Sequence, residues 1–384
     1  MTDASALARL PRSRRMDGAL LLLTVALALL GFVMVLSASA PSAQFRLSDS
    51  LYFFKKQLLW GALGFGAMAI GTVMAPDRLR PFSRLALIGV TVLLALTYIP
   101  GIGVEKLGAS RWLHLGPLSL QPSELAKLAL VLYLADVLAR KPRSAWTLRD
   151  MRHAILPVVG LLGLVNFQPD LGTTLVLTAT VFAMFLCAGT PPLFLLAWLA
   201  AGAAGAWFKI QHTAYQKERL LAFLDPWGHS RDIGFQITQS LMAIGSGGIF
   251  GTGWGQGKQK LFYLPIQHSD FIFSVLAEEL GLIGSVVVVL LFLAFATRGM
   301  AIAAGARSDF ARLLATGITA YIVFQAFLNI AVVTSSVPTT GIPLPLMSFG
   351  GTSLLVTLFG VGLLLAISRK PGAESGSLGP PPRS

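Results

Sequence analysis

Charged side chains are scarce in this sequence. Asp, Glu, Lys and Arg make up 12% of its 384 residues, while 54% of the residues are hydrophobic. Soluble domains carry roughly 25% charged residues, so this composition excludes an ordinary soluble protein. Together with a mean hydropathy of +0.71 it predicts an integral membrane protein. Lys and Arg in cytoplasmic loops, and not nucleic-acid binding, then explain the formal net charge of +13.

The sequence contains only one cysteine, and no segment of it resembles a soluble domain. The single cysteine, Cys187, lies in an apolar run, so no disulfide can form within the chain, and it says nothing about the redox compartment. Apolar segments close to the ~20 residues that a membrane-spanning helix needs recur along the whole chain instead. They lie at residues 17–38, 57–75, 84–100, 123–139, 153–168, 172–189, 191–209, 271–297, 311–334 and 344–367.

These segments predict an all-α integral membrane protein with ten transmembrane helices. The first segment is too long for a secretory signal peptide and lacks a clear small-residue cleavage site. Lys and Arg are more numerous in the segments that lie inside when the N-terminus is cytoplasmic. Because short basic loops stay on the cytoplasmic side, both termini are predicted to be cytoplasmic.

Two of the predicted outer connections are too long to be simple turns. Residues 101–122 join the third and fourth spans, and residues 210–270 form a large extracellular loop between the seventh and eighth. Loops of this length are usually functional or disordered. Aromatic and amphipathic stretches in 210–270 predict a folded element lying partly in the membrane interface. We therefore expect one membrane domain over 1–370 and a disordered cytoplasmic tail over 371–384.

A glycine-rich run, GSGGIFGTGWGQGKQK, covers residues 245–260 of the large loop. It lacks the Walker A pattern, because Thr252 and Gln259 stand where that motif requires Gly and then Ser or Thr. Two interpretations remain open. The run is either a flexible turn region that glycine permits, or a loop whose amides, with Lys258 and Lys260, meet an anionic substrate.

A possible polar cluster begins with QPSELAK (121–127), which opens the fourth span. Glu124 and Lys127 are three residues apart and share a helix face. Lys127 lies about one turn inside the membrane, where a lone ammonium is costly. Asp170 is predicted at a comparable depth, so we expect a Glu124–Lys127–Asp170 cluster, either a structural ion-pair network or the wall of a polar cavity. Arg111, beside a tryptophan, is either an interfacial anchor or part of this site.

The segment PTTGIPLPLMSFGGTSLL (338–355) begins the tenth span with prolines, glycines and hydroxyls such as that of Ser348. An interrupted helix is tolerated in a bilayer only where it is buried in protein or lines a cavity. The alternative is close packing of helices through small residues.

Three acids stand at the start of the eighth span, in PIQHSDFIFSVLAEELG (265–281). Asp270 alone is also typical of a helix N-cap. Since other polar groups are predicted at the same membrane depth, we interpret Asp270, at the water boundary, as a candidate catalytic base. Glu278 and Glu279 are predicted to lie deeper and to pair with other helices or with the wall of the cavity.

Several of these segments are similar to signature segments of the SEDS family (shape, elongation, division and sporulation), which groups the FtsW, RodA and SpoVE proteins. The similarity covers roughly residues 15–370 and rests on RWLHLGPLSLQPSELAKLALVLYLAD, NFQPDLGTT, GFQITQSLMAIGSGGIFGTGWGQGKQKLFYLPIQHSDFIFSVLAEELGLIG and GIPLPLMSFGGTSLL. DPW at 225–227 and QKLFYLP look more like the FtsW and sporulation branches, whereas GIPLPL is closer to RodA usage.

The resemblance implies a ten-span protein of the bacterial cytoplasmic membrane that polymerises lipid II into glycan strands on the outer face. Such proteins serve septal or lateral wall synthesis, release polyprenyl pyrophosphate, and work with a class B penicillin-binding protein and the division or elongation machinery. The resemblance also implies that Asp270 is the essential carboxylate and that Glu124, Lys127 and Asp170 form a polar cluster. Arg111 matches the arginine of an Arg-Trp motif.

This chain departs mildly from two of the family's motifs. Ser269 replaces a threonine before Asp270, and Phe349 replaces a tyrosine after Ser348. Neither change removes the candidate carboxylate or the candidate substrate-binding hydroxyl of Ser348.

The expected reaction joins a sugar hydroxyl to a donor carrying a lipid pyrophosphate. Asp270 would act as the base, and Glu278 would belong, with Glu124 and Asp170, to a supporting polar cluster. Arg111, Lys127, Lys258 and Lys260 would meet the pyrophosphate, and a divalent cation would suit the same task, although the sequence offers no convincing metal-ligand set. A lipid II flippase or transporter is the alternative function, and a non-enzymatic scaffold is a third.

Overall fold

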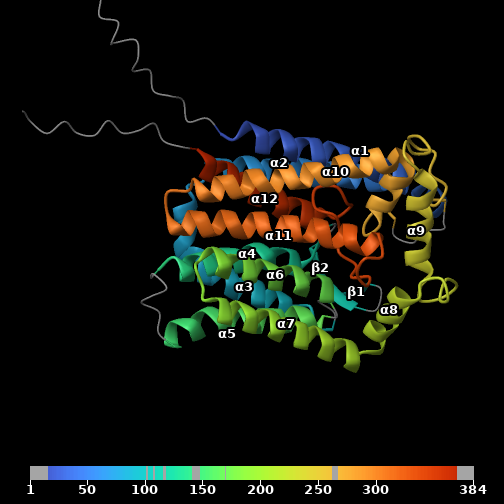
Figure 1. Ribbon diagram of the computed structural model, residues 1–384. Helices are drawn as coiled ribbons and strands as arrows, with labels where there is room; N and C mark the ends of the chain where they lie inside the picture. Colours follow the sequence, from blue (N-terminus) through green and yellow to red (C-terminus); the bar gives the residue numbers. More distant parts are fainter. Residues whose placement is uncertain are drawn as a thin grey trace, which may run out of the picture.

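The computed structural model describes residues 16–100, 103–106, 109–115, 118–140, 148–168, 170–261 and 267–369. Long helices lie side by side in one bundle (Figure 1). They are α1 Gly18–Leu47, α2 Tyr52–Val73, α3 Ser83–Leu96, α4 Pro122–Leu138, α5 Leu148–Phe167, α6 Leu171–Cys187, α7 Pro192–His212, α10 Ile272–Ala304, α11 Asp309–Val333 and α12 Gly351–Ser368. A short 3-10 helix, η2 Pro76–Phe82, precedes α3.

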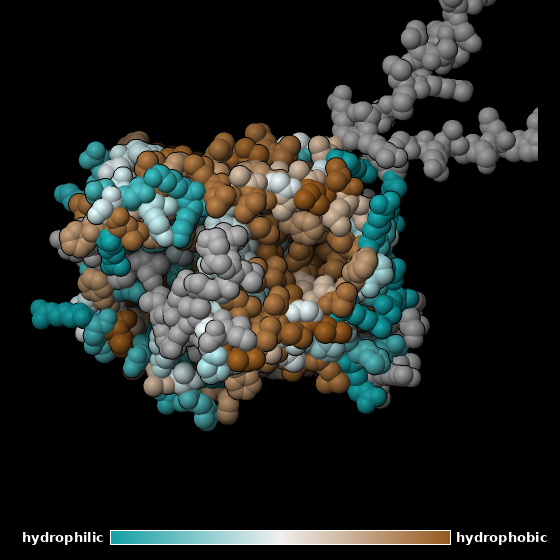
Figure 2. Space-filling model, turned by 180° about the vertical axis from the view of Figure 1, so that it is seen from behind, coloured by the Kyte–Doolittle hydropathy of each residue, from teal (hydrophilic) through white to brown (hydrophobic). Residues whose placement is uncertain are grey.

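Each predicted span overlaps one of these long helices. Within the described residues, seven helical segments are long and apolar enough to cross a membrane. Helices α4 and α6, with 17 residues each, are shorter than those seven. On the face seen in Figure 2, hydrophobic residues lie across the middle of the molecule and hydrophilic residues lie toward both ends. These features indicate a multi-pass membrane protein.

One part of the chain contradicts the all-α prediction. Between α3 and α4 lies a three-stranded antiparallel sheet in the order β1-β2-β3. Its strands are β1 Gly103–Lys106, β2 Ala109–Leu115 and β3 Leu118–Leu120. So small a sheet needs support from its surroundings. Thr352 of α12 supplies it by donating to Ser119 O at 3.3 Å and accepting from Gln121 N at 3.2 Å.

The loop predicted over 210–270 contains two short helices, α8 Ala214–Leu224 and α9 Phe235–Gly247. In Figure 1, α9 runs across the end of the bundle, at a steep angle to the long helices. The opposite end holds the start of α1 and the end of α12, which Asp17 N and Ser368 Oγ join at 3.0 Å. The predicted tail, 371–384, lies outside the described residues.

Helix α10 is broken near its start. Gly281 has φ +68° and ψ −165°, which separates a half-helix, 272–280, from the rest. Residues 247–253 fill the break: Thr252 N and Gly253 N donate to the carbonyls of Glu278 and Glu279 at 2.9 and 3.1 Å. Leu282 N in turn donates to Gly248 O at 2.9 Å. The glycine-rich loop therefore satisfies the last carbonyls of the half-helix and the first amides of the helix that follows the break.

The last helix begins later than predicted, at Gly351 and not at 344. Residues 338–350 form turns and coil inside the bundle, and most of their apolar side chains are buried, including Leu344, Leu346 and Met347. Gly341 and Leu346 have positive φ values, 71° and 65°, that no helix accommodates. The segment is therefore irregular before the helix begins, and α12 itself runs from Gly351 to Ser368 without a break.

Gly281→Ala is expected to lower the free energy of unfolding by about 1–3 kcal/mol, because alanine is strained at this φ. Its Cβ would also collide with Gly251 N and Ile249 O. The measurement is the thermal unfolding midpoint of the purified protein in detergent. Gly89→Ala in α3 is the matched control, because nothing lies within 4 Å of its Cβ position. Equal midpoints for the two variants would contradict the strain argument.

Candidate active site

Asp270 lies in the turn just before α10 and is partly exposed. Its Oδ1 accepts a hydrogen bond from Ser269 Oγ at 2.9 Å. The backbone is held from two sides: Asn329 Nδ2 of α11 donates to Asp270 O at 2.8 Å, and Ser348 Oγ donates to Ser269 O at 2.6 Å. The backbone that carries the carboxylate is therefore held in place from two sides.

The same side chains hold the coil before α12 against this turn. Asn329 Nδ2 also donates to Ile342 O at 2.8 Å, and Ser348 Oγ accepts from Leu344 N at 2.8 Å. Phe349 N donates to His268 O at 2.9 Å. Ser348 was expected to bind substrate, but both hydrogen bonds of its hydroxyl are made within the protein, so it positions the turn that carries Asp270.

Two arginines act on Asp270. Arg219 of α8 donates through Nη1 to Thr339 O at 2.8 Å, and its Nη2 contacts Tyr215 Oη. A Cβ placed on Gly341 would lie 3.6 Å from Asp270 Oδ2 and 3.9 Å from Arg219 Nη2, so these groups share one small volume. Arg111 of β2 donates through Nε to Gln168 O at 2.9 Å.

Burial raises the pKa of the Asp270 carboxyl above its ordinary value, and this effect prevails over the opposing ones. The Ser269 hydroxyl, Arg219 and Arg111 lower the pKa, while the negative charge of Asp170 raises it. A carboxylate with a raised pKa is a stronger base than an ordinary aspartate, as a general base requires.

The neighbouring His268 is not a cation at neutral pH. Burial, and then the charge of Arg46, lower the pKa of its imidazole to about 4. Its ring lies 4.3 Å from the ring of Phe53 and 5.5 Å from that of Phe349, measured between centroids. His268 thus packs as an aromatic side chain beside the carboxylate.

Asp170 acts on Asp270 through its charge. It caps α6, with Oδ1 accepting from Thr173 N at 3.0 Å and Oδ2 from Thr173 Oγ1 at 2.9 Å. Its side chain is buried. The field of its charge reaches both Asp270 and Arg219. In the part of the chain that the structure describes, no ion pair joins Asp170 to Lys127, so the expected three-residue cluster is divided between two places.

Glu124 and Lys127 form the second place, as a buried pair on α4. Lys127 Nζ lies 2.6 Å from Glu124 Oε2 and 2.5 Å from Gln325 Oε1 of α11. Gln325 Nε2 donates to Pro343 O at 2.9 Å. The pair is therefore connected, through one amide, to the coil that holds the Asp270 turn.

Lys260 does not lie where it was expected, because its side chain is paired with Glu279 inside the protein. Its Nζ lies 2.6 Å from Glu279 Oε1 and donates to Ser37 Oγ of α1 at 2.9 Å. Only 4% of Lys260 is exposed, so its ammonium is committed inside the protein and does not face an anionic substrate. The sequence could not show this, because the partner acid lies nineteen residues away beyond a turn. Glu279 pairs with other elements, as predicted.

Glu278 fixes the glycine-rich loop. Its Oε1 accepts from the backbone amides of Lys258 at 2.7 Å and Gln259 at 3.2 Å. The Lys258 side chain is exposed. Of the three lysines expected to meet substrate, Lys258 is exposed, whereas Lys127 and Lys260 are buried.

Sequence reasoning missed Arg219, Gln325 and Asn329. A signal for the last two was present, because they are four residues apart and place amides on one face of an otherwise apolar span. Arg219 offered no comparable signal, since it lies in a short helix rich in charged residues. For metal binding, no group of three His, Cys, Asp or Glu that could hold an ion occurs among the described residues, and the divalent cation stays a prediction.

Comparison with known proteins decides the family. The model of the FtsW/RodA/SpoVE family, described as cell cycle proteins, matches residues 18–372. The chain belongs to this family. The SEDS resemblance is thereby confirmed.

Similar proteins cover nearly the whole chain. The "Probable peptidoglycan glycosyltransferase FtsW" of Geobacter sulfurreducens is 43% identical over 360 residues, 93% of this chain and 96% of that protein. Stage V sporulation protein E of Bacillus subtilis is 39% identical, over 92% of this chain and 97% of that protein.

Two solved structures extend the similarity to the fold. A chain of a peptidoglycan synthase complex that coordinates polymerization and crosslinking has a TM-score of 0.77 and 33% identity, covering 92% of this chain and 98% of its own. RodA of Thermus thermophilus has a TM-score of 0.70 and 31% identity, covering 94% and 98%.

Lys260→Met should lower the free energy of unfolding by about 3–5 kcal/mol, because it leaves the buried Glu279 charge without its cation. Lys260→Met/Glu279→Gln should recover part of this loss, since the double variant removes the unpaired charge. Chemical or thermal unfolding in detergent gives the measurement. Lys258→Met is the control and should change stability by less than about 0.5 kcal/mol, because its ammonium is exposed. Equal effects of the two single lysine variants would refute the buried-pair assignment.

Proposed function

We propose that this chain polymerises lipid II into glycan strands on the outer face of the bacterial cytoplasmic membrane, with Asp270 as general base. As a member of the FtsW/RodA/SpoVE family it is a peptidoglycan glycosyltransferase. The observation that carries the residue assignment is the placement of Asp270. Its carboxylate has a raised pKa, a backbone fixed by Asn329 and Ser348, and two arginines acting on it.

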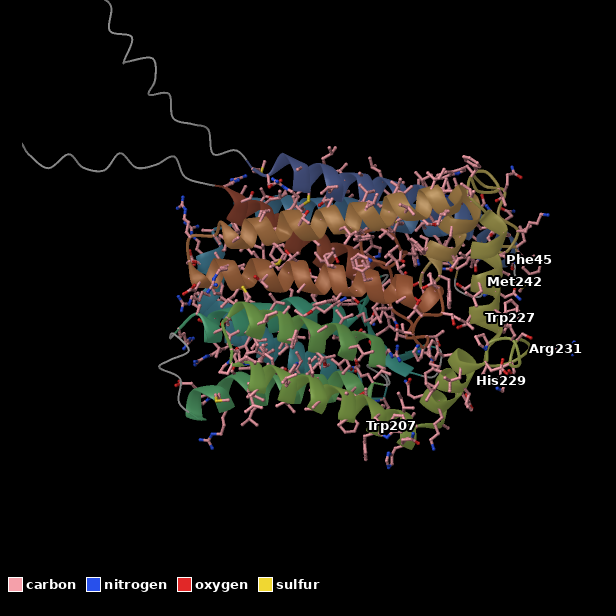
Figure 3. The ribbon with its side chains drawn as sticks, in the orientation of Figure 1. Phe45, Trp207, Trp227, His229, Arg231 and Met242 are labelled. Atoms are coloured by element: carbon pink, nitrogen blue, oxygen red, sulfur yellow. The ribbon has the colours of Figure 1, made fainter. Side chains whose placement is uncertain are left out.

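The proposed topology has ten spans, α1–α7 and α10–α12, with both termini in the cytoplasm. It is supported by the distribution of Lys and Arg along the chain. The end with α8 and α9 is then extracellular. Figure 3 shows Trp207 and Trp227 near that end, and each is 60% exposed. Exposed tryptophans near the ends of a bundle suit the membrane–water interface, where their amphipathic rings are enriched.

In the proposed reaction, the acceptor hydroxyl loses its proton to Asp270 as it attacks the anomeric carbon of the donor. A sugar hydroxyl is a poor nucleophile, and a positioned base typically contributes 10²–10⁴-fold. The leaving group is a lipid pyrophosphate, and guanidinium groups suit its oxygens because they form paired hydrogen bonds. Arg219 and Arg111 are the proposed contacts, with the accessible Lys258 as a third cation. Lys127 binds Glu124 and Gln325, and it is proposed to stabilise the coil that holds the Asp270 turn without contacting the substrate.

An apolar cavity of about 640 Å³ offers a place for the polyprenyl chain. Helices α5, α6 and α7 line it almost entirely, with Phe182 and Trp198 among the lining side chains and glycine and alanine along α7. Asn166 and Leu171, which lie on either side of Asp170 in the sequence, also line it. A lipid in this cavity would have its pyrophosphate end beside the site, with the chain in the bilayer.

A class B penicillin-binding protein is the proposed partner, within the division or elongation machinery. Support comes from the similar chain in a complex that coordinates polymerization and crosslinking. The higher identity to FtsW and sporulation relatives favours a role in division over lateral growth.

Asp270→Asn should abolish polymer formation by purified protein supplied with lipid II and its partner, with a loss of at least about 100-fold, because the amide cannot take the proton. Lipid II binding and the thermal unfolding midpoint should stay unchanged. Glu218→Gln, an exposed substitution on α8, is the matched control and should polymerise normally.

Two results of that assay would end the assignment. Polymer formed by Asp270→Asn at the wild-type rate would remove Asp270 as the base. Labelled lipid II that crosses the vesicle bilayer without forming polymer would identify the wild-type protein as a flippase.

Arg219→Gln should move the acidic limb of the activity profile to higher pH. Asp270 must be ionised to act, and Arg219 lowers the pKa of its carboxyl. Loss of this positive charge raises that pKa further, so a larger share of the base is protonated at a given pH. The measurement is polymerisation rate against pH. Arg219→Lys should keep the limb near its wild-type position, and Arg231→Gln, exposed between α8 and α9, is the control. An unshifted limb in Arg219→Gln would contradict the coupling.

A further inference from the structure

A second cavity lies at the other end of the molecule, remote from Asp270. It has a volume of about 300 Å³ and is formed by the end of α2, the start of η2, the start of α11 and the end of α12. This end of the bundle carries the first residues of α1 and the last of α12 (Figure 1). In the proposed topology it faces the cytoplasm, at the depth where phospholipid headgroups lie.

Two arginines line this cavity, Arg307 from the connection between α10 and α11, and Arg369 just after α12. Among the described residues, neither is part of an ion pair. Arg369 Nε is buried and has no hydrogen-bond acceptor in the described part of the molecule. Because a buried donor without a partner is costly, this nitrogen is suited to an oxygen that comes from outside the chain.

The rest of the lining is divided between polar and apolar groups. Ser308 and Asp77 supply a hydroxyl and a carboxylate, with Ser308 Oγ 3.4 Å from Asp77 Oδ1. Val73, Met74 and Ile367 supply apolar surface. A ligand that fits this lining has an anionic group, at least one hydrogen-bond donor for the carboxylate, and an apolar part.

A neighbouring hollow shows what an occupied arginine site looks like in this protein. Arg80 and Arg140 line a surface depression between η2 and α4. Their guanidinium groups already bind Asp136, at 2.9 and 2.5 Å, and Ser83 Oγ adds a hydrogen bond at 3.0 Å. The carboxylate satisfies these cations, whereas no described carboxylate, Asp77 included, lies within ion-pair distance of Arg307 or Arg369.

We propose that the cavity lined by Arg307 and Arg369 binds the phosphate of an anionic phospholipid headgroup. A planar guanidinium binds phosphate oxygens through paired hydrogen bonds. The hydroxyls of a glycerol headgroup can donate to Asp77, and the glycerol-ester region contacts the apolar wall. The site requires neither glycosyl transfer nor the catalytic residues.

Binding of phosphatidylglycerol to the purified full chain, measured by native mass spectrometry, tests this proposal. Each arginine near an anionic headgroup contributes roughly fivefold in affinity. The affinity of Arg307→Gln/Arg369→Gln for the most tightly bound phosphatidylglycerol molecule should therefore be about thirtyfold lower than that of the wild type. Arg78→Gln/Arg84→Gln removes the same charge from exposed arginines that lie outside the cavity lining, and should bind as the wild type does. Phosphatidylcholine should show no difference among the three proteins.

Two further measurements make the outcome decisive. Arg307→Lys/Arg369→Lys keeps the charge and should retain most of the binding, which separates loss of the site from loss of folding. Inorganic phosphate at millimolar concentration is the competing source of the same chemistry. If it stabilises the wild type against heat as much as phosphatidylglycerol does, and has no effect on the glutamine variant, then free phosphate is the ligand and the lipid assignment is wrong. Equal phosphatidylglycerol binding by the two glutamine variants would overturn the site altogether.

Discussion

The structure depends on the cost of leaving backbone polar groups unpaired away from water. The coil before α12 and the turn before α10 are both irregular, and both lie within the bundle or against its end. They persist because Asn329 and Ser348 bind the carbonyls and amides that no helix satisfies. These hydrogen bonds also fix the position of Asp270. The side chains that satisfy the irregular backbone therefore build the candidate site.

Two groups of charges serve different purposes in this framework. Glu124 with Lys127, and Glu279 with Lys260, are buried pairs at 2.6 Å. Each lysine also donates to a side chain far away in the sequence, Lys127 to Gln325 of α11 and Lys260 to Ser37 of α1. Arg219, Arg111, Asp170 and Asp270 act on one another mainly through their fields. A buried pair balances its own charge and holds structure in place. The second group surrounds the candidate base and is proposed to act on the substrate.

The sequence predicted the helices well and the contacts poorly, for identifiable reasons. Apolar runs near the length of a membrane span located the long helices that the structure describes, because a helix that crosses a bilayer needs about 20 apolar residues. The sheet at 103–120 was missed, since its strands are short and held partly by Thr352 of a distant helix. Asp270 was found because a carboxylate at the start of a span is unusual. The burial of Lys260 against Glu279 and the position of Arg219 near Asp270 could not be predicted. Each depends on how the large loop folds back on the bundle, and no local sequence pattern encodes this.

The left-handed break at Gly281 joins the glycine-rich loop to the half-helix before it. The last carbonyls of residues 272–280 are satisfied by amides of residues 247–253, and the first amides of the following helix by carbonyls of the same loop. Neither segment can lose its hydrogen bonds without exposing those of the other. The two should therefore open together, and their amide protons should exchange with solvent as one block, at a rate distinct from that of the neighbouring helices.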